Sequence, residues 1–348
     1  MISFYPGPSR VYEEVPKYVK EAYDKGVLSI NHRSQAFMDI IKATNEEIKK
    51  KLLVPDDYSV FYVSSATECW EIIAESYDIS STQYYNGAFG EKWFEYTKKL
   101  KENTFGHHFH FEEELKLETV DKPSKGLICL TQNETSNGTQ LSNPCIAAIN
   151  NKYPDHLIAV DATSSMAGIK LDFNKADIWF ASVQKCFGLP AGMAVMICSP
   201  RAIESAALNL HYNSLANIAQ NMERLQTTHT PNVMGIYLLL KTMQESPSIT
   251  TTEQVLKDRI EAYLEIISAK KTIKPMVGQS EVRSTTVLVV EGEEKIIGSI
   301  KAQAKESGLI LGNGYGVWKN TTFRIANFPA LKDKEVKLLL SFLKKNIQ

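Results

Sequence analysis

Short apolar runs alternate with amphipathic stretches along most of the chain. Runs this short, bounded by polar turns, indicate buried strands, and the helical spacing between them indicates helices that cover a sheet. Strands that alternate with helices are typical of an α/β fold with a mainly parallel sheet. The apolar runs are Tyr58–Val63, Gln83–Tyr85, Gly126–Leu130, Leu157–Val160, Ile178–Val183 and Met193–Cys198.

Helical spacing is clearest from Gln35 to Leu53, where apolar residues would share one buried face. These residues are Phe37, Ile40, Ile41, Ile48 and Leu52. A further helical stretch is predicted from Arg201 to Arg224.

The pattern changes after residue 245. A long helix is followed by shorter strands and helices, and the chain closes with an amphipathic helix over Lys332–Asn346. We therefore predict a large domain over residues 16–245 and a smaller α+β domain over residues 246–348. Residues 1–15 are rich in Pro and Gly and predict an extended arm that packs against the smaller domain.

Charge and cysteine content exclude several classes of protein. The formal net charge is -1 and no basic block is present, so we expect neither a nucleic-acid partner nor a membrane partner. The five cysteines include no C-x-x-C pair, which favours reduced thiols in a cytoplasmic protein. A metal site at His107, His108 and His110 is the alternative to a plain strand there. We expect none, because no carboxylate or cysteine completes it.

The residues that could form a site fall where the predicted strands end. They are Ser64–Thr67, Phe89 in a strand-to-helix turn, Asn133–Thr135, Asp161 and Gln184-Lys185. Ligands of parallel α/β sheets bind beyond the carboxyl ends of the strands. The coincidence predicts one composite site at that edge.

The residue types at this edge suit pyridoxal phosphate. A poorly solvated lysine has a lowered pKa and can condense with the cofactor aldehyde, while an aspartate keeps the pyridine nitrogen protonated. The helix N-terminus after Ser64 could bind the phosphate, or Ser65 or Thr67 could simply cap that helix. Phe89 could stack on the ring or merely cover the core.

Several short motifs resemble those of a known family and follow the same order along nearly the whole chain. They are Tyr5-Pro6-Gly7-Pro8, His32-Arg33, Asn133-Glu134-Thr135, Asp161-Ala162-Thr163-Ser164-Ser165, Gln184-Lys185 with the Gly-Pro-Ala-Gly turn, Thr230-Pro231-Asn232 and Phe323-Arg324-Ile325-Ala326-Asn327. The sequence resembles the class V aminotransferases of pyridoxal-phosphate fold type I. Within them it is most similar to the phosphoserine aminotransferase branch.

The resemblance implies roles for the residues at the strand ends. Lys185 would bind the cofactor and move the proton of the substrate Cα, and Asp161 would pair with the pyridine nitrogen. Thr135 would bond the ring hydroxyl, and Phe89 stands where the family usually stacks a tryptophan. Ala66, Thr67 and Gln184 would hold the phosphate.

The resemblance also implies roles for residues outside the strand ends, some of them in a second subunit. His229 and Thr230 would complete the phosphate site of a second subunit, so a homodimer with shared active sites is expected. Arg324 would bind the substrate α-carboxylate. His32 and Arg33 would reach the substrate phosphate from the neighbouring subunit.

One departure concerns the substrate. The family usually has a His-Arg pair shortly before the carboxylate arginine, whereas this chain has Gly312-Asn313-Gly314-Tyr315-Gly316. The expected activity is transamination between phosphoserine and 2-oxoglutarate in serine biosynthesis. The alternatives are a class V aminotransferase acting on alanine, serine or glyoxylate, and a non-catalytic transaminase-like binding protein. A cysteine desulfurase is disfavoured because no cysteine lies in a plainly exposed late loop.

Overall fold

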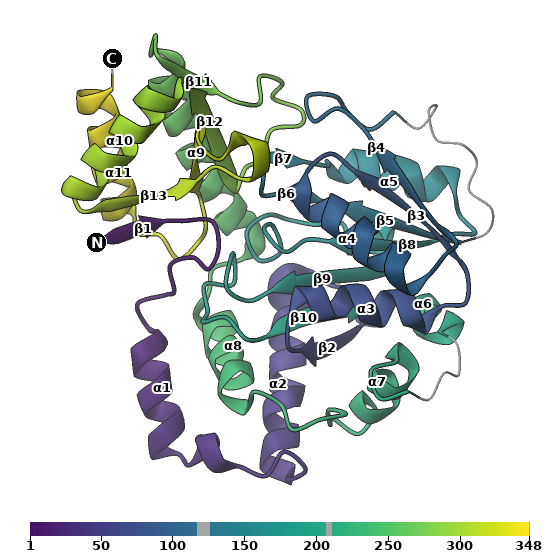
Figure 1. Cartoon of the computed structure of the whole chain (residues 1–348). Coiled ribbons are helices and arrows are strands. Elements are labelled where there is room, and N and C mark those ends of the chain that lie inside the picture. Colours follow the sequence, from purple (N-terminus) through teal and green to yellow (C-terminus); the bar gives the residue numbers. More distant parts are fainter. Residues whose placement is uncertain (117–125, 207–210, 348) are drawn as a thin grey trace.

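The computed structural model describes residues 1–116, 126–206 and 211–347. Within them the largest sheet has the strand order β2-β10-β9-β8-β5-β3-β4 (Figure 1). Only β10 runs against its neighbours, so the expected mainly parallel α/β sheet is confirmed. The strands are β2 (Ser59–Val63), β3 (Ser80–Tyr85), β4 (Thr104–His108), β5 (Gly126–Thr131), β8 (Leu157–Asp161), β9 (Ile178–Ser182) and β10 (Ala194–Cys198).

Helices cover this sheet. In Figure 1, α3 and α4 lie in front of it, and α2 runs beside α8 near its β2 edge. The helices of this part of the molecule are α1 (Val15–Asp24), α2 (Gln35–Leu52), α3 (Ala66–Ser76), α4 (Ala88–Leu100), α5 (Asn143–Lys152), α6 (Pro200–Ser205), α7 (Leu215–Met222) and α8 (Val233–Glu245), with short 3-10 turns η1 (Val27–Ser29) and η3 (Phe173–Lys175).

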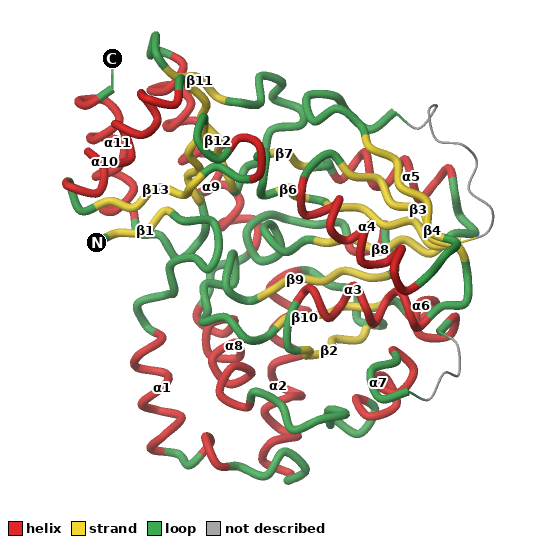
Figure 2. Tube along the Cα trace, viewed as in Figure 1, coloured by secondary structure: helices red, strands yellow, loops and turns green. Residues whose placement is uncertain are grey.

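A second, smaller sheet has the order β1-β13-β14-β12-β11 within the described residues. Figure 2 shows its strands apart from the large sheet. It consists of β1 (Ile2–Phe4), β11 (Ile273–Pro275), β12 (Val287–Gly292), β13 (Leu309–Asn313) and β14 (Thr322–Ala326), with helices α9 (Ile249–Ser268), α10 (Glu294–Glu306), α11 (Asp333–Asn346) and the turn η4 (Gly316–Trp318). The N-terminal residues thus join this sheet, where β1 pairs in parallel with β13.

Two hydrophobic cores accompany the two sheets. The predicted buried face of α2 enters the larger core, where Phe37 and Ile41 are fully buried. Phe4 of β1 lies instead in the core of the second sheet, with α9, α10 and α11. The division of the chain into domains at residues 245 and 246 stays a prediction. Among the described residues, no helix combines the length and apolar character needed to cross a membrane.

The predicted helical stretch from Arg201 to Arg224 is only partly helical in the structure. The structure has α6 and α7 instead, and residues 207–210 lie outside the described part. Ser214 starts α7 afresh, because its hydroxyl accepts a hydrogen bond from the backbone N–H of Asn217. The stretch from His107 to His110 is not a strand throughout, since β4 ends at His108 and His110 lies beyond it.

Asp177 precedes β9 and connects several elements at the end of the large sheet opposite the predicted site. Its carboxylate accepts hydrogen bonds from Ile158 N (2.9 Å) and Ser199 Oγ (3.0 Å). Arg201 binds the same carboxylate through Nε (2.9 Å) and Nη2 (2.6 Å). Asp177 is 5% exposed, so these donors must stabilise its buried charge in place of water. The contacts join the start of β8 to the end of β10 and to α6.

We expect Asp177→Ala to lower the free energy of unfolding by about 3 kcal/mol, because it leaves buried donors without their acceptor. Urea unfolding measures the change. Asp155→Ala, at an exposed carboxylate nearby, is the control and should change stability by less than about 0.5 kcal/mol. Equal stability of the two variants would contradict the role given to Asp177.

Candidate active site

A cavity of about 330 Å³ lies at the carboxyl ends of β5, β8 and β9. Its size falls within the range of small-ligand pockets. Seven residues that the sequence assigned to the cofactor line it together, namely Ala66, Thr67, Phe89, Thr135, Asp161, Gln184 and Lys185. The expected composite site therefore exists as one space, although the role of each residue stays a prediction.

Lys185 follows β9 and is 8% exposed. Its Nζ donates a hydrogen bond to Thr135 Oγ1 at 2.9 Å and lies 5.1 Å from the centre of the Phe89 ring. Burial lowers the pKa of Lys185 to about 8, against the opposing effects of Asp161 and Glu134. About a tenth of this amine is therefore unprotonated, and nucleophilic, at pH 7.

Thr135 links Lys185 to a buried hydroxyl network. Its Oγ1 donates to Ser164 Oγ at 2.9 Å, and Ser164 Oγ donates to Asn133 O at 2.9 Å. Asn133 Nδ2 also donates to Ser164 Oγ at 2.7 Å. Since Asn133, Thr135 and Ser164 are all buried, the network fixes the position of the Thr135 hydroxyl.

Asp161 is the last residue of β8 and is 6% exposed. Its Oδ1 accepts a hydrogen bond from Thr163 N at 2.9 Å. Burial raises the pKa of Asp161, while the contacts with Thr163 and the charge of Lys185 oppose that shift. The structure thus places a carboxylate and an amine of opposite charge around the same cavity.

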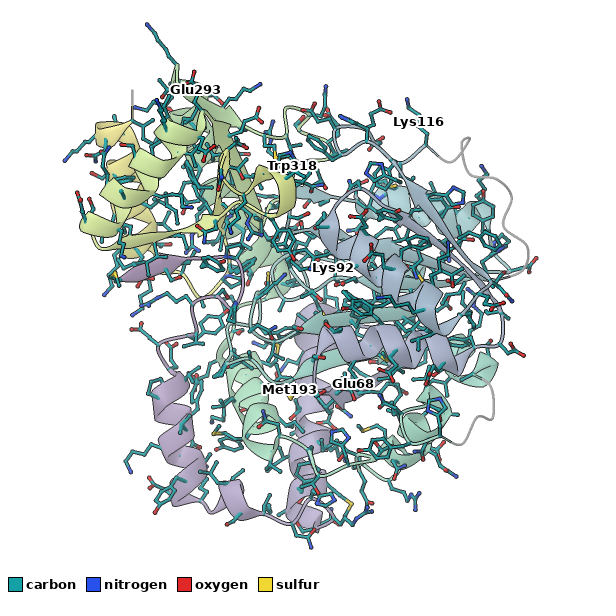
Figure 3. All side chains as sticks on the ribbon, in the orientation of Figure 1. Glu68, Lys92, Lys116, Met193, Glu293 and Trp318 are labelled. Carbon is teal, nitrogen blue, oxygen red and sulfur yellow. The ribbon has the colours of Figure 1, made fainter. Side chains whose placement is uncertain are left out.

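The N-terminus of α3 is capped by Ser65, whose hydroxyl accepts a hydrogen bond from Glu68 N at 3.1 Å. This is the capping alternative from the sequence. Ala66 N donates to Ser182 Oγ at 3.2 Å, and the Glu68 carboxylate, labelled in Figure 3, accepts from Ser64 N at 2.6 Å. Capping does not exclude an anion, because Ala66 and Thr67 still line the cavity at the positive end of the helix dipole.

Gln184 holds an unsatisfied polar atom beside the cavity. Its Oε1 is buried and has no hydrogen-bond partner among the described residues. Buried polar atoms are nearly always paired, so an orphaned one at a cavity wall suits a ligand donor. Gln184 also lines a second, adjoining cavity.

Glu134 lies in the stretch that the sequence placed at the site, but no role was predicted for it. Its Oε2 accepts hydrogen bonds from Phe89 N (3.1 Å) and Gly90 N (3.0 Å), at the start of α4. Gly87 offers that helix no capping side chain, and Glu134 supplies the acceptor from the small hairpin of β6 (Asn133–Glu134) and β7 (Thr139–Gln140). Glu134 thereby fixes the backbone that carries Phe89.

Arg324, on β14, lies in the wall of the second cavity, which has a volume of about 450 Å³. Its Nε donates to Asn313 O at 2.6 Å and its Nη1 donates to Thr135 O at 2.9 Å. Phe89, Thr135, Gln184 and Lys185 line both cavities, so Arg324 faces a space continuous with that around Lys185. Lys319 lines the second cavity as well.

Four of the predicted residues lie away from both cavities. His32 and Arg33 precede α2, and His229 and Thr230 precede α8. The structure brings these two loops together, because Arg33 Nη1 donates to Gln226 Oε1 at 3.0 Å. Within one chain neither loop contributes to the lining of the site.

Comparison with known proteins gives the site a family. The family described as Aminotransferase class-V matches residues 92–305. The phosphoserine aminotransferase of Corynebacterium glutamicum (strain R) is 23% identical over 351 residues, covering 96% of this chain and 91% of that protein.

Two solved structures of aminotransferases are also similar to this chain. A crystal structure of a phosphoserine aminotransferase from Cytophaga hutchinsonii has a TM-score of 0.94 at 32% identity, covering 100% of this chain and 99% of that one. A PLP-bound phosphoserine aminotransferase from Trichomonas vaginalis, at 17% identity, has a TM-score of 0.83 and shares the fold, with 98% of this chain and 99% of that one covered.

We expect an amine-reactive ester to acetylate Lys185 of the folded protein with a midpoint near pH 8, because only the neutral amine reacts. In urea-unfolded protein the midpoint should move up towards 10.5, the ordinary lysine value. Asp161→Asn should lower the folded-state midpoint, since the carboxylate favours the ammonium form. Peptide mass spectrometry measures the labelling, and equal midpoints in the folded and unfolded protein would contradict the burial effect.

Proposed function

Since this chain belongs to the class V aminotransferases, we propose that it uses pyridoxal phosphate to transfer the amino group of phosphoserine to 2-oxoglutarate. One observation carries the proposal. Lys185 and Asp161, an amine with a pKa near 8 and a buried carboxylate, line the same cavity at adjacent strand ends. The relatives named phosphoserine aminotransferase support the substrate assignment.

The cavity suits this cofactor. A flat ring with an aldehyde, a basic nitrogen, a hydroxyl and a phosphate needs an amine, a carboxylate, a hydroxyl partner and an anion site. Lys185, Asp161 and Thr135 would provide the first three. Ala66 and Thr67 at the α3 N-terminus would provide the fourth, and the Gln184 side-chain amide would donate a further hydrogen bond to the phosphate.

When bound, pyridoxal phosphate supplies a ring that withdraws the electron pair from the substrate Cα. Lys185 Nζ would take the Cα proton, because its lowered pKa leaves it able to accept one at neutral pH. Thr135 Oγ1 and the Ser164 network would hold Nζ in place beforehand. Asp161 would hold a proton on the ring nitrogen, and Phe89 would cover the ring face.

Arg324 would bind the substrate α-carboxylate. A guanidinium matches a carboxylate in shape and can bind it through two hydrogen bonds. Its Nε and Nη1 are already held by carbonyls, and Nη2 has no partner among the described residues. The contact with Thr135 O also fixes Arg324 against the wall that carries Lys185.

We propose a homodimer in which each subunit completes the other's site. His32 and Arg33 share a surface with the loop of His229 and Thr230, away from the cavities of their own chain. In a dimer these two loops would bring cations to the partner's phosphate groups.

A cytoplasmic location and a role in serine biosynthesis complete the proposal. All five cysteines are free thiols, and Cys69, Cys129, Cys186 and Cys198 are buried. A reducing compartment keeps such thiols from oxidation.

We expect Lys185→Ala to abolish the visible absorption band of the cofactor-loaded protein and to lower transamination of phosphoserine by about 10³-fold or more. Absorption spectroscopy and a coupled assay for glutamate measure the two effects. Lys98→Ala, at an exposed lysine of α4 that lines neither cavity, is the control.

Adding phosphoserine, serine, alanine and glutamate separately to the wild type identifies the donors. A wild-type protein that stays colourless with excess cofactor would refute the cofactor assignment. Reaction with alanine or serine but not with phosphoserine would refute the substrate and leave the family intact.

The shared site predicts complementation between two inactive variants. One variant carries Lys185→Ala, and the other carries both Arg33→Ala and His229→Ala. Each variant alone should lose activity. Refolded together, they should recover about a quarter of the wild-type activity, because half of randomly mixed dimers hold one intact site. No recovery from a mixture that forms dimers in sedimentation runs would show that each chain is complete by itself.

A further inference from the structure

Helix α4 presents a lysine to the cavity besides Phe89. Phe89 and Lys92 are one turn apart, so they share a face of the helix. Both line the cavity around Lys185. Figure 3 labels Lys92 at the side of the large sheet that faces the second sheet.

Lys92 meets Tyr315, which comes from the loop between β13 and β14. Lys92 Nζ donates a hydrogen bond to Tyr315 Oη at 2.6 Å. The Tyr315 ring lies 5.1 Å from the Phe89 ring and 5.5 Å from the Arg324 guanidinium carbon. The contact therefore crosses from the large sheet to the second sheet directly beside Arg324.

Positive charge dominates the lining of the second cavity, where Tyr315 lies. Lys185, Lys319 and Arg324 line the second cavity, and no acidic residue of the described chain lines it. Within the described residues, neither Lys92 nor Lys319 forms an ion pair with a carboxylate. Unpaired cations at a cavity favour an anionic ligand. Arg324 would take one acidic group, which leaves the remaining cations for a second.

Tyr315 is suited to join Lys92 in this task. A tyrosine hydroxyl can accept a hydrogen bond from an ammonium group and donate its own hydrogen to an anion at the same time. Charge-assisted hydrogen bonds of this kind are stronger than neutral ones. Tyr315 also stands in the stretch where the family resemblance leads one to expect a His-Arg pair, so this chain has an aromatic hydroxyl where a cation was expected.

We propose that Lys92 and Tyr315 bind the acidic group at the far end of the substrate side chain, and so select amino acids that carry a side-chain phosphate or carboxylate. The inference rests on the proposed transamination. It adds a contact between α4 and the β13–β14 loop to the cations that the partner subunit would bring to the distal end of the substrate. Arg324, beside Tyr315, would bind the α-carboxylate of the same molecule.

The test compares Lys92→Met and Tyr315→Phe with the wild type, all loaded with cofactor. Methionine keeps the length of the lysine chain without its charge, and phenylalanine keeps the ring without its hydroxyl. Lys98→Met removes one charge from an exposed position of the same helix and is the control. Spectral titration gives the half-saturating concentration of O-phospho-L-serine, L-glutamate and L-alanine.

We expect both variants to raise the half-saturating concentrations of phosphoserine and glutamate about tenfold or more, the loss of a charge-assisted hydrogen bond. The value for alanine should change less than about twofold, because alanine has no distal acid. An effect on phosphoserine alone, or on glutamate alone, supports the proposal and identifies which acid is selected. An equal effect on alanine, or no effect on any donor, overturns it.

A binding measurement separates this inference from the proposed function. Calorimetric titration of inorganic phosphate should give a dissociation constant about tenfold weaker in Lys92→Met than in the wild type or Lys98→Met. If no donor reacts with the wild type, the proposed transamination fails, and this difference alone decides the role of Lys92. Unchanged phosphate binding in Lys92→Met counts against it.

Discussion

The burial of one amine governs the chemistry of this protein. Lys185 is almost completely removed from solvent, and each unit of pKa shift corresponds to about 1.4 kcal/mol. A shift from 10.5 to about 8 therefore means that holding the charged form costs about 3 kcal/mol. Between these two values the folded chain has released a proton that the unfolded chain still binds, so the cost of burial declines and the folded protein becomes more stable as the pH rises through that window. The charges of Asp161 and Glu134 reduce this cost.

The site depends equally on contacts that join the two sheets. Arg324 Nη1 binds Thr135 O, so the residue beside the amine and the guanidinium of the second sheet share one hydrogen bond. Lys92 and Tyr315 form a second connection at the outer side of the same space. A ligand that contacts both Arg324 and Lys185 can therefore bind only when the two sheets are correctly positioned relative to each other.

Much of this arrangement could be predicted from the sequence, for identifiable reasons. The strands of the large sheet are short apolar runs, and parallel strands bring their carboxyl ends to one edge, so Asp161 and Lys185 had to meet. The acceptor for the α4 N-terminus could not be found in this way, because Glu134 lies 44 residues from Gly90 and belongs to another element. Lys92 and Tyr315 are 223 residues apart, and only the packing of the two sheets reveals their contact.

The N-terminal strand has a consequence for how the protein is made. Ile2–Phe4 pair with Leu309–Leu311, and Ser9 N and Oγ donate to Gln184 O, while Gly7 lies against the Lys185 side chain. Ile2–Phe4 therefore find their strand partner only after residue 311 has been synthesised. During translation the large sheet can form while β1 waits unpaired. The wall of the cavity beside Lys185 is thus completed only when residues 2–9 and the strand at Leu309–Leu311 have come together.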